Sequence, residues 1–241
     1  DAAGTFYFDD GFVFPTGGVI CAGIAEDAGI VYGAFGRLIC QWSEANDLWD
    51  AVLFSTAAFN SIVQYDGDIF AAHADGTAYY YGATTSWTQN TIVAPGQDAN
   101  FFVVSRDTLW KGILASIDTT NHGVFSSTSP RNAGSWSARY AVGTVDLDIT
   151  GLYAIDDIIL VGKEEGAFIY NRVVNDWFAA DTFANITTEW TTMPSGENFS
   201  RGKESFGWLY LTAAMQSLYR YSHRLNVFEN ISSLLFAPRL T

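Results

Sequence analysis

A repeated pattern is the feature of this sequence that most limits its fold. Five short apolar runs begin 39, 40, 49 and 50 residues apart, and they cover residues 30–35, 69–74, 109–114, 158–163 and 208–213. A second run, closed by an aromatic residue, follows each of them. In four repeats another aromatic comes seven residues later; these pairs are Trp42 and Trp49, Tyr80 and Trp87, Tyr170 and Trp177, and Tyr221 and Phe228. Self-similarity at such a period is typical of repeat architectures.

Each repeat predicts four short strands. In the second repeat we expect strands at residues 61–65, 69–73, 77–81 and 87–93, with turns at Asp66-Gly67 and Asp75-Gly76. Asp-Gly between apolar runs favours a hairpin, because type I′ turns need positive φ at both central residues. Four-stranded antiparallel units at this spacing predict an all-β fold, a β-propeller whose blades are the repeats.

The two ends of the chain bear on the number of blades. Residues 4–14 align with residues 76–87, the third and fourth strands of a repeat, and residues 232–236 resemble a lone first strand. We therefore expect six blades, five complete and one composite blade made from the two termini. Five blades is the alternative, and a third possibility is a segment of a longer polypeptide. We expect residues 1–241 to form a single domain.

Composition excludes several classes of protein. The chain has 12 Lys and Arg against 26 Asp and Glu, a net charge of −14, which argues against binding to nucleic acid phosphates. A hydrophobic content of 49% with only 16% charged residues argues against intrinsic disorder. No run approaches 18 consecutive apolar residues, so we expect no membrane insertion.

The cysteines are expected to be free. Cys21 falls in the first strand of the first complete repeat and Cys40 in its third strand. Two strand spacings separate them by about 9.5 Å, beyond the reach of a disulfide, and we expect both thiols to be buried. Three sequons, at Asn185, Asn198 and Asn230, leave glycosylation open.

Propeller geometry selects the candidate binding residues. Loops that join the second strand to the third, or the fourth strand to the next repeat, lie at the same strand ends and form what we call the predicted binding face. Its candidate ligand-binding residues are Arg37, Asp75, Asp98, Asp118, His122, Asp146, Asp148, Lys163, Glu164, Trp190 and Arg201. Polar groups with aromatic rims in a concave site suit sugar or peptide ligands. The structural alternative is that the aspartates only order their turns.

No complete catalytic constellation is visible in the sequence. The three histidines have no zinc-ligand spacing, and no nucleotide-binding or nucleophile motif occurs, so we expect no metal, no cofactor and no enzyme activity. The alternative is a glycoside hydrolase or lyase of propeller type. It would need a carboxylate pair as acid and base, drawn from Asp75, Asp118, Asp146, Asp148 and Glu164.

One hairpin resembles a known structural motif. Residues 123–136, Gly-Val-Phe-Ser-Ser-Thr-Ser-Pro-Arg-Asn-Ala-Gly-Ser-Trp, resemble the Asp-box of sialidase-like propellers. Asn132 stands where that motif usually has Asp, and a Pro-Arg insertion precedes it. The Asp-box is a structural turn, so the resemblance implies the fold. The predicted binding face supplies only Arg37 and Arg201, whereas sialidases use three arginines, so sialidase chemistry is not implied.

A second resemblance concerns the setting in which the protein acts. Residues 160–170, Leu-Val-Gly-Lys-Glu-Glu-Gly-Ala-Phe-Ile-Tyr, resemble repeats in propeller domains of tail and surface proteins of tailed phages and similar viruses. This resemblance implies a structural or adhesion module in a virion, or an extracellular protein. Its partners would be other subunits of an assembly, or a cell-surface glycan or receptor. The oligomeric state and the ligand stay open.

Overall fold

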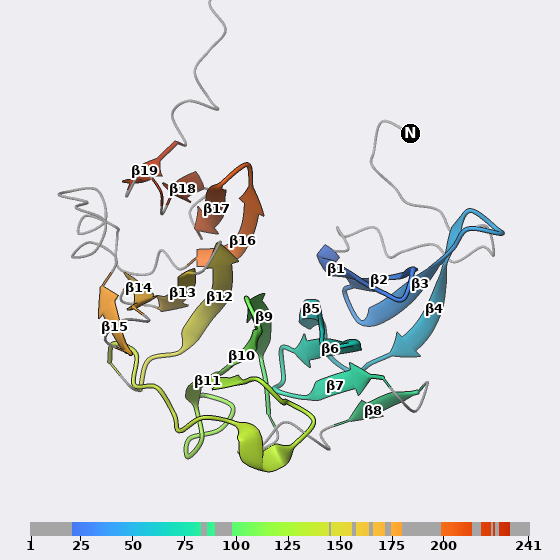
Figure 1. Cartoon of the computed structure of the whole chain (residues 1–241), viewed down its shortest axis with the longest axis horizontal. Coiled ribbons are helices and arrows are strands. Elements are labelled where there is room, and N and C mark those ends of the chain that lie inside the picture. The colour runs from blue at the N-terminus through green and yellow to red at the C-terminus, as the bar shows by residue number, and fades with distance from the viewer. Residues whose placement is uncertain are drawn as a thin grey trace, which may run out of the picture. The chain divides into compact units, whose positions relative to one another are not determined.

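The computed structural model describes an all-β chain. The residues described are 21–82, 86–89, 98–144, 146–155, 158–163, 166–171, 175–179, 199–213, 218–222, 224 and 227–231. The chain divides into two compact units, Asp1–Phe102 and Val103–Thr241. Figure 1 shows the strands as arrows gathered into small sheets. In the part of the chain that is described, no helix has the length and apolarity to cross a membrane.

The first unit contains two four-stranded sheets. The first sheet runs in chain order through β1 (Cys21–Asp27), β2 (Ile30–Phe35), β3 (Leu38–Ser43) and β4 (Leu48–Phe54). The second runs through β5 (Phe59–Tyr65), β6 (Asp68–His73), β7 (Ala78–Tyr81) and β8 (Trp87–Gln89). Every neighbouring pair is antiparallel, as expected when only a few residues connect successive strands.

Three further sheets follow, the first of them beginning where the first unit ends. A three-stranded sheet has β9 (Phe101–Ser105), β10 (Thr108–Ile113) and β11 (Gly123–Ser127), and the short 3-10 helix η1 (Ala133–Ser135) follows it. The next sheet has β12 (Ile149–Ile155), β13 (Ile158–Lys163), β14 (Gly166–Asn171) and β15 (Asp176–Ala179). The last has β16 (Phe199–Ser205), β17 (Trp208–Ala213), β18 (Leu218–Ser222) and β19 (Val227–Asn230).

The predicted fold class is confirmed at the level of the sheets. The second strands of three repeats, β2, β13 and β17, cover the same residues as the predicted apolar runs, and β6 and β10 begin one residue earlier. β6 and β13 are buried along their whole length, as expected when both faces of a sheet are covered. The described residues form five sheets, and the composite blade predicted from the termini falls outside them, so six blades stays a prediction.

The turn between the first and second strands of a sheet has the predicted geometry in three repeats. Asp66 and Gly67 have φ of 50° and 75°, the double positive φ of a type I′ turn. Ala28-Gly29 and Phe206-Gly207 adopt the same conformation without Asp. Asp75-Gly76 is different, because only Gly76 has positive φ (89°) and its amide donates to the carbonyl of His73 (3.2 Å).

The third sheet departs from the predicted four-strand pattern. After β11 the chain forms η1, where the Asn132 side chain accepts a hydrogen bond from the amide of Gly134 (3.1 Å). The chain then returns beside β11, and the amides of Ser137 and Tyr140 donate to the carbonyls of Ser126 (2.8 Å) and Val124 (2.9 Å). A short irregular segment thus replaces the fourth strand of this repeat. The connection after β11 is longer than in the other repeats, and part of it forms the helical turn η1.

Aromatic side chains join the third and fourth strands of most sheets. The ring of Trp49 lies 5.4 Å from that of Trp42, and Trp177 lies 5.2 Å from Tyr170, as the spacing predicts. Trp87 faces Tyr81 on β7 (5.5 Å), the residue after the Tyr80 that the spacing singled out. The side chain of Phe228 lies outside the described part.

Trp136 is also buried. The Lys111 ammonium on β10 lies 4.8 Å from its ring centroid, a cation–π contact with the second strand of the sheet.

Both cysteines are free, with β2 between their strands, as predicted. Cys40 is buried, and burial raises the pKa of its thiol to about 11. The expectation that Cys21 is buried is wrong, because the residue is exposed. It opens β1 beside an irregularity in register between Cys21 and Gly23, so the regular alternation that buries alternate side chains is not yet established there.

Candidate functional site

The predicted binding face of the first unit carries Arg37, Asp75 and Asp98. Arg37 is exposed in the turn between β2 and β3, and its carbonyl accepts a hydrogen bond from the amide of Ser55 (2.9 Å). Asp98 is half-buried and forms a backbone bridge to Thr77. These backbone contacts tie the loop after each sheet to the loop between its second and third strands.

Asp75 forms a polar pair with a buried histidine. Oδ1 of Asp75 lies 3.1 Å from Nδ1 of His73 and accepts a hydrogen bond from the amide of Thr77 (3.0 Å). Burial lowers the pKa of His73 below its ordinary 6.5 despite the nearby carboxylate, so the contact is a hydrogen bond from a neutral ring. Burial opposes ionisation of Asp75, but the Thr77 and His73 hydrogen bonds outweigh it and lower the pKa below 3.8.

Asn100 closes the same loop from the next repeat. Its side chain is fully buried, and Nδ2 donates to the carbonyls of His73 (3.2 Å) and Ala74 (3.1 Å). Sequence reasoning did not identify this contact. The asparagine therefore holds the His73–Asp75 loop in place.

Asp118 orders a loop in the second unit. Its carboxylate accepts hydrogen bonds from the amides of Thr120 (2.8 Å) and Asn121 (2.9 Å) and from the Asn121 side chain (3.1 Å). Partial burial opposes ionisation, but these donors outweigh it and lower the pKa of Asp118 below 3.8. A carboxylate held in this way is a turn-forming group and a poor proton donor near neutral pH.

Asp148 connects two loops of the second unit. Its oxygens accept hydrogen bonds from the amide (3.0 Å) and hydroxyl (2.7 Å) of Ser116, which lies 32 residues earlier. Asp146 is exposed two residues before it. Asp118 and Asp148 thus both form hydrogen bonds within the loop between β10 and β11, Asp118 as part of that loop and Asp148 from a later one. Asp146 is exposed to solvent.

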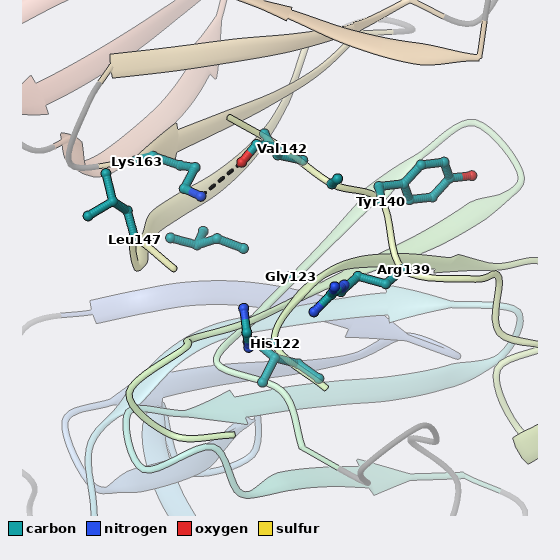
Figure 2. Close-up of a pocket in the computed structure, with 10 residues that line it drawn as sticks. His122, Gly123, Arg139, Tyr140, Val142, Leu147 and Lys163 are labelled. Carbon is teal, nitrogen blue, oxygen red and sulfur yellow. Dashed lines mark hydrogen bonds between the residues drawn. The ribbon is translucent and has the colours of Figure 1, made fainter. Parts of the chain in front are cut away.

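His122 and Lys163 are brought together at one small cavity, shown in Figure 2. The cavity has a volume of about 10 Å³, room for one water molecule. The Lys163 ammonium is buried and donates to the carbonyls of Val142 (2.8 Å) and Thr144. His122 donates from Nδ1 to the carbonyl of Asp118 (3.1 Å), and its buried Nε2 has no hydrogen-bond partner among the described residues.

The remaining candidate residues are less fully described. Glu164 and Trp190 lie outside the described residues, and Arg201 belongs to β16 without a described side chain. Within the residues that are described, no group of three or more His, Cys, Asp or Glu side chains could hold a metal ion.

A larger hollow, which sequence reasoning missed, lies at the opposite ends of the strands of the second unit. This surface, which we call the hydroxyl pocket, has a volume of about 390 Å³. Eight of its nine lining residues carry a hydroxyl group. The nine are Thr108, Trp110, Ser126, Ser127, Thr128, Ser135, Ser137, Tyr140 and Tyr170. The serine-rich hairpin at residues 123–136 was the available signal, but it was interpreted only as a turn.

The hydroxyl pocket rests on a cluster of aromatic rings. Trp110 lies 5.5 Å from Tyr140 and 5.0 Å from Tyr170, and Trp177 packs 6.2 Å from Trp110 behind them. Trp110, Tyr170 and Trp177 are buried, and Tyr140 is half-buried. Trp110 meets Tyr170 and Trp177 edge to face and Tyr140 at a tilt, and this packing fixes the rings relative to one another at the base of the pocket.

Comparisons with known proteins identify the fold. No family model and no curated protein sequence matches this chain. It is similar to the extracellular domain of BT4673 from B. thetaiotaomicron, with a TM-score of 0.61 and 13% identity over 90% of this chain. The chain spans 28% of the length of that structure.

Two other solved structures share the architecture. YCF48 bound to D1 peptide has a TM-score of 0.59 and 13% identity, with 87% of this chain and 67% of that chain covered. A chain of the Mitotic Checkpoint Complex has a TM-score of 0.57 and 12% identity, with 85% and 62% covered. With the antiparallel four-stranded sheets, these likenesses show that the chain has a β-propeller fold.

Proposed function

We propose that this protein is a non-enzymatic binding module that acts outside the cell or on a virion surface, where it attaches to a glycan or a protein partner. The observation that carries the proposal is that three carboxylates of the predicted binding face are already engaged in hydrogen bonds with loop backbone. Asp75, Asp118 and Asp148 already accept hydrogen bonds within or between their own loops. They serve to make the loops rigid, which suits a surface for binding.

The competing hydrolase function has the opposite electrostatic requirement. A glycoside hydrolase needs one carboxyl group whose pKa is raised so that it can donate a proton. The pKa values of Asp75 and Asp118 are lowered instead. Exposed residues on the predicted binding face, namely Arg37, Asp75 and Asp146, are our candidates for contact with a protein partner.

Structural neighbours support the location and the kind of partner. One of them is an extracellular domain, and another is bound to a peptide. The virion setting is supported only by the resemblance of residues 160–170 to repeats of phage tail and surface proteins. A propeller that displays loops of fixed geometry is compatible with either setting.

Incubation of the labelled full chain with a printed glycan array and with a panel of intact bacterial cells tests the proposal. We expect saturable binding to at least one surface and no release of reducing ends from the glycans. Absence of saturable binding to every surface would overturn the proposal. So would release of reducing ends that is lost in Asp118→Asn or Asp148→Asn, because hydrolysis would then depend on these carboxylates.

A further inference from the structure

We propose that the hydroxyl pocket of the second unit binds a neutral saccharide. The inference names a ligand class for the binding function proposed above and rests on it. It also moves the site to the strand ends opposite the predicted binding face. The pocket lies beside the turn before β10 and the end of β11, whereas His122 and Lys163 lie at the other ends of these sheets.

The lining of the pocket selects for a neutral ligand. Its nine residues are serine, threonine, tyrosine and tryptophan, so the lining contains no carboxylate, ammonium or guanidinium group. A charged ligand would lose hydration on entering such a pocket without gaining a counter-charge, which is unfavourable. A ligand rich in hydroxyl groups loses water but can exchange it for the hydroxyls of the wall.

The wall hydroxyls keep hydrogen-bonding capacity for a ligand. Ser126 Oγ and Tyr140 OH lie 3.3 Å apart, and Ser127 Oγ lies 2.6 Å from Ser135 Oγ. Two hydroxyls that share one hydrogen bond retain a second hydrogen and further lone pairs. The Ser126–Tyr140 pair therefore keeps one hydrogen to donate, whereas Ser135 donates its hydrogen into its own turn, so the Ser127–Ser135 pair offers acceptor lone pairs only. Together the two pairs present a donor and acceptors, which matches a sugar hydroxyl because it also donates and accepts.

The aromatic base supplies the apolar part of the recognition. Trp110, Tyr140 and Tyr170 line the pocket and pack against one another. Trp110 and Tyr170 are buried, so they support the half-buried ring of Tyr140, which is the aromatic surface that a ligand can contact. Sugar rings have an apolar face of C–H groups between their polar edges. A pocket that combines aromatic rings with a few placed hydroxyls fits both parts of such a molecule.

The pocket is held ready before a ligand arrives. Ser135 Oγ donates into the turn at the carbonyls of Ser129 (2.5 Å) and Asn132 (2.7 Å), which anchors η1 beside the pocket. Ser137 Oγ accepts a hydrogen bond from the amide of Ser126 (3.0 Å). A pre-ordered wall reduces the entropy lost on binding. The volume of about 390 Å³ lies within the range of small-molecule sites.

The test measures binding of defined sugars to the full chain by saturation-transfer NMR and calorimetry. The probes are lactose, maltotriose, cellotriose and chitotriose, with 3′-sialyllactose as the charged counterpart of lactose. We expect saturable binding of at least one neutral sugar. Preferential binding of 3′-sialyllactose over every neutral probe would overturn the proposal.

Three variants locate the site. Tyr140→Phe removes one pocket hydroxyl and keeps the ring, and we expect binding about three- to tenfold weaker. Thr128→Trp fills the pocket from an exposed position on its wall, and we expect loss of binding. Thr119→Ala removes an exposed hydroxyl in the loop at the other end of β10 and β11, and we expect no change. Circular dichroism confirms that each variant is folded.

The outcomes separate this proposal from the broader one. Sugar binding that survives in folded Thr128→Trp would overturn the pocket as the site. Absence of binding to all neutral sugars by a protein that still binds intact cells would overturn the saccharide inference and leave the proposed binding function standing. Absence of binding in both experiments would overturn both.

Discussion

At the scale of the residue, His73 links stability to pH. Its ring is fully buried on β6 and contacts Ser55 (3.3 Å), Asp75 (3.1 Å) and the rings of Phe59 and Tyr79. Burial lowers the pKa of His73 in the folded state, so the unfolded chain binds the proton first as pH falls. The neutral His73 ring therefore stabilises the fold above pH 6.5, its ordinary pKa. This stabilisation is lost as the pH falls below that value.

We therefore predict that the urea midpoint falls between pH 7.5 and pH 5, and that the fall is smaller in His73→Asn, which cannot titrate. Asp75 adds a second loss at more acidic pH, below its ordinary pKa of 3.8, because its pKa is lowered in the folded state. Chemical denaturation at several pH values checks both windows. An unchanged pH dependence in His73→Asn would contradict the assignment.

At the scale of the element, the turn between β16 and β17 contains a residue poorly suited to its backbone. Phe206 has φ of 52° and is 98% exposed, so it pays for a left-handed conformation without gaining burial. We predict that Phe206→Asn raises the free energy of unfolding by about 0.5–1 kcal/mol, because Asn tolerates this region. Phe206→Val should lower it, since a β-branched residue tolerates positive φ least. Thermal and urea denaturation distinguish the two.

The neighbouring glycine isolates the backbone contribution. Gly207 has φ of 76°, and a Cβ added there would meet no atom within 4 Å. Gly207→Ala should therefore lower the free energy of unfolding by about 1 kcal/mol through conformation alone. A neutral effect in urea denaturation would mean that the turn changes its conformation at little cost.

A second prediction at this scale concerns the loops that tie successive repeats together. Asn100→Ala would remove two hydrogen bonds, one to the buried carbonyl of His73, which keeps only the amide of Gly76, and one to the carbonyl of Ala74. We predict a loss of about 2 kcal/mol in the free energy of unfolding. Asn46→Ala is the matched control, because Asn46 is exposed and donates only locally to Ser43 (3.2 Å). Equal effects of the two substitutions in urea denaturation would show that Asn100 has no special role.

At the scale of the whole molecule, Trp177 tests whether the chain behaves as the predicted single domain. Its ring is buried among Trp110, Tyr140 and Tyr170. Truncation to Ala should cost about 3–5 kcal/mol in the free energy of unfolding. Trp208→Ala, which removes a half-buried ring beneath Arg220, should cost less. Because ring closure couples all blades of a propeller, we expect the loss to reach residues 21–82 as well.

Hydrogen exchange provides the measurement for this prediction. The amides of β6 in the first unit and β13 in the second would be followed in wild-type protein and in Trp177→Ala. We expect faster exchange in both strands. Faster exchange confined to β13 would show that Asp1–Phe102 and Val103–Thr241 unfold separately, and the single-domain prediction would then be wrong.

Most strands, and most of the turns that join them, could be predicted from local sequence patterns. β2, β13 and β17 follow from apolar runs, and the Asp66-Gly67 turn follows from the φ preferences of its residues. These features are local, because strand alternation and turn geometry depend on residues a few positions apart. The exception is the repeat containing Trp136, where a few additional residues formed η1 and displaced the fourth strand.

The contacts between distant loops and side chains could not be predicted from the sequence and became visible in the folded chain. Asn100 reaches His73 over 27 residues, Ser116 reaches Asp148 over 32, and Lys163 reaches Val142 over 21. His122 and Lys163 were predicted separately, but their shared cavity depends on how two sheets pack. The hydroxyl pocket was not predicted at all, because its walls come from β10, β11, the segment after η1 and β14. No local pattern encodes such a surface, since packing between sheets brings its parts together.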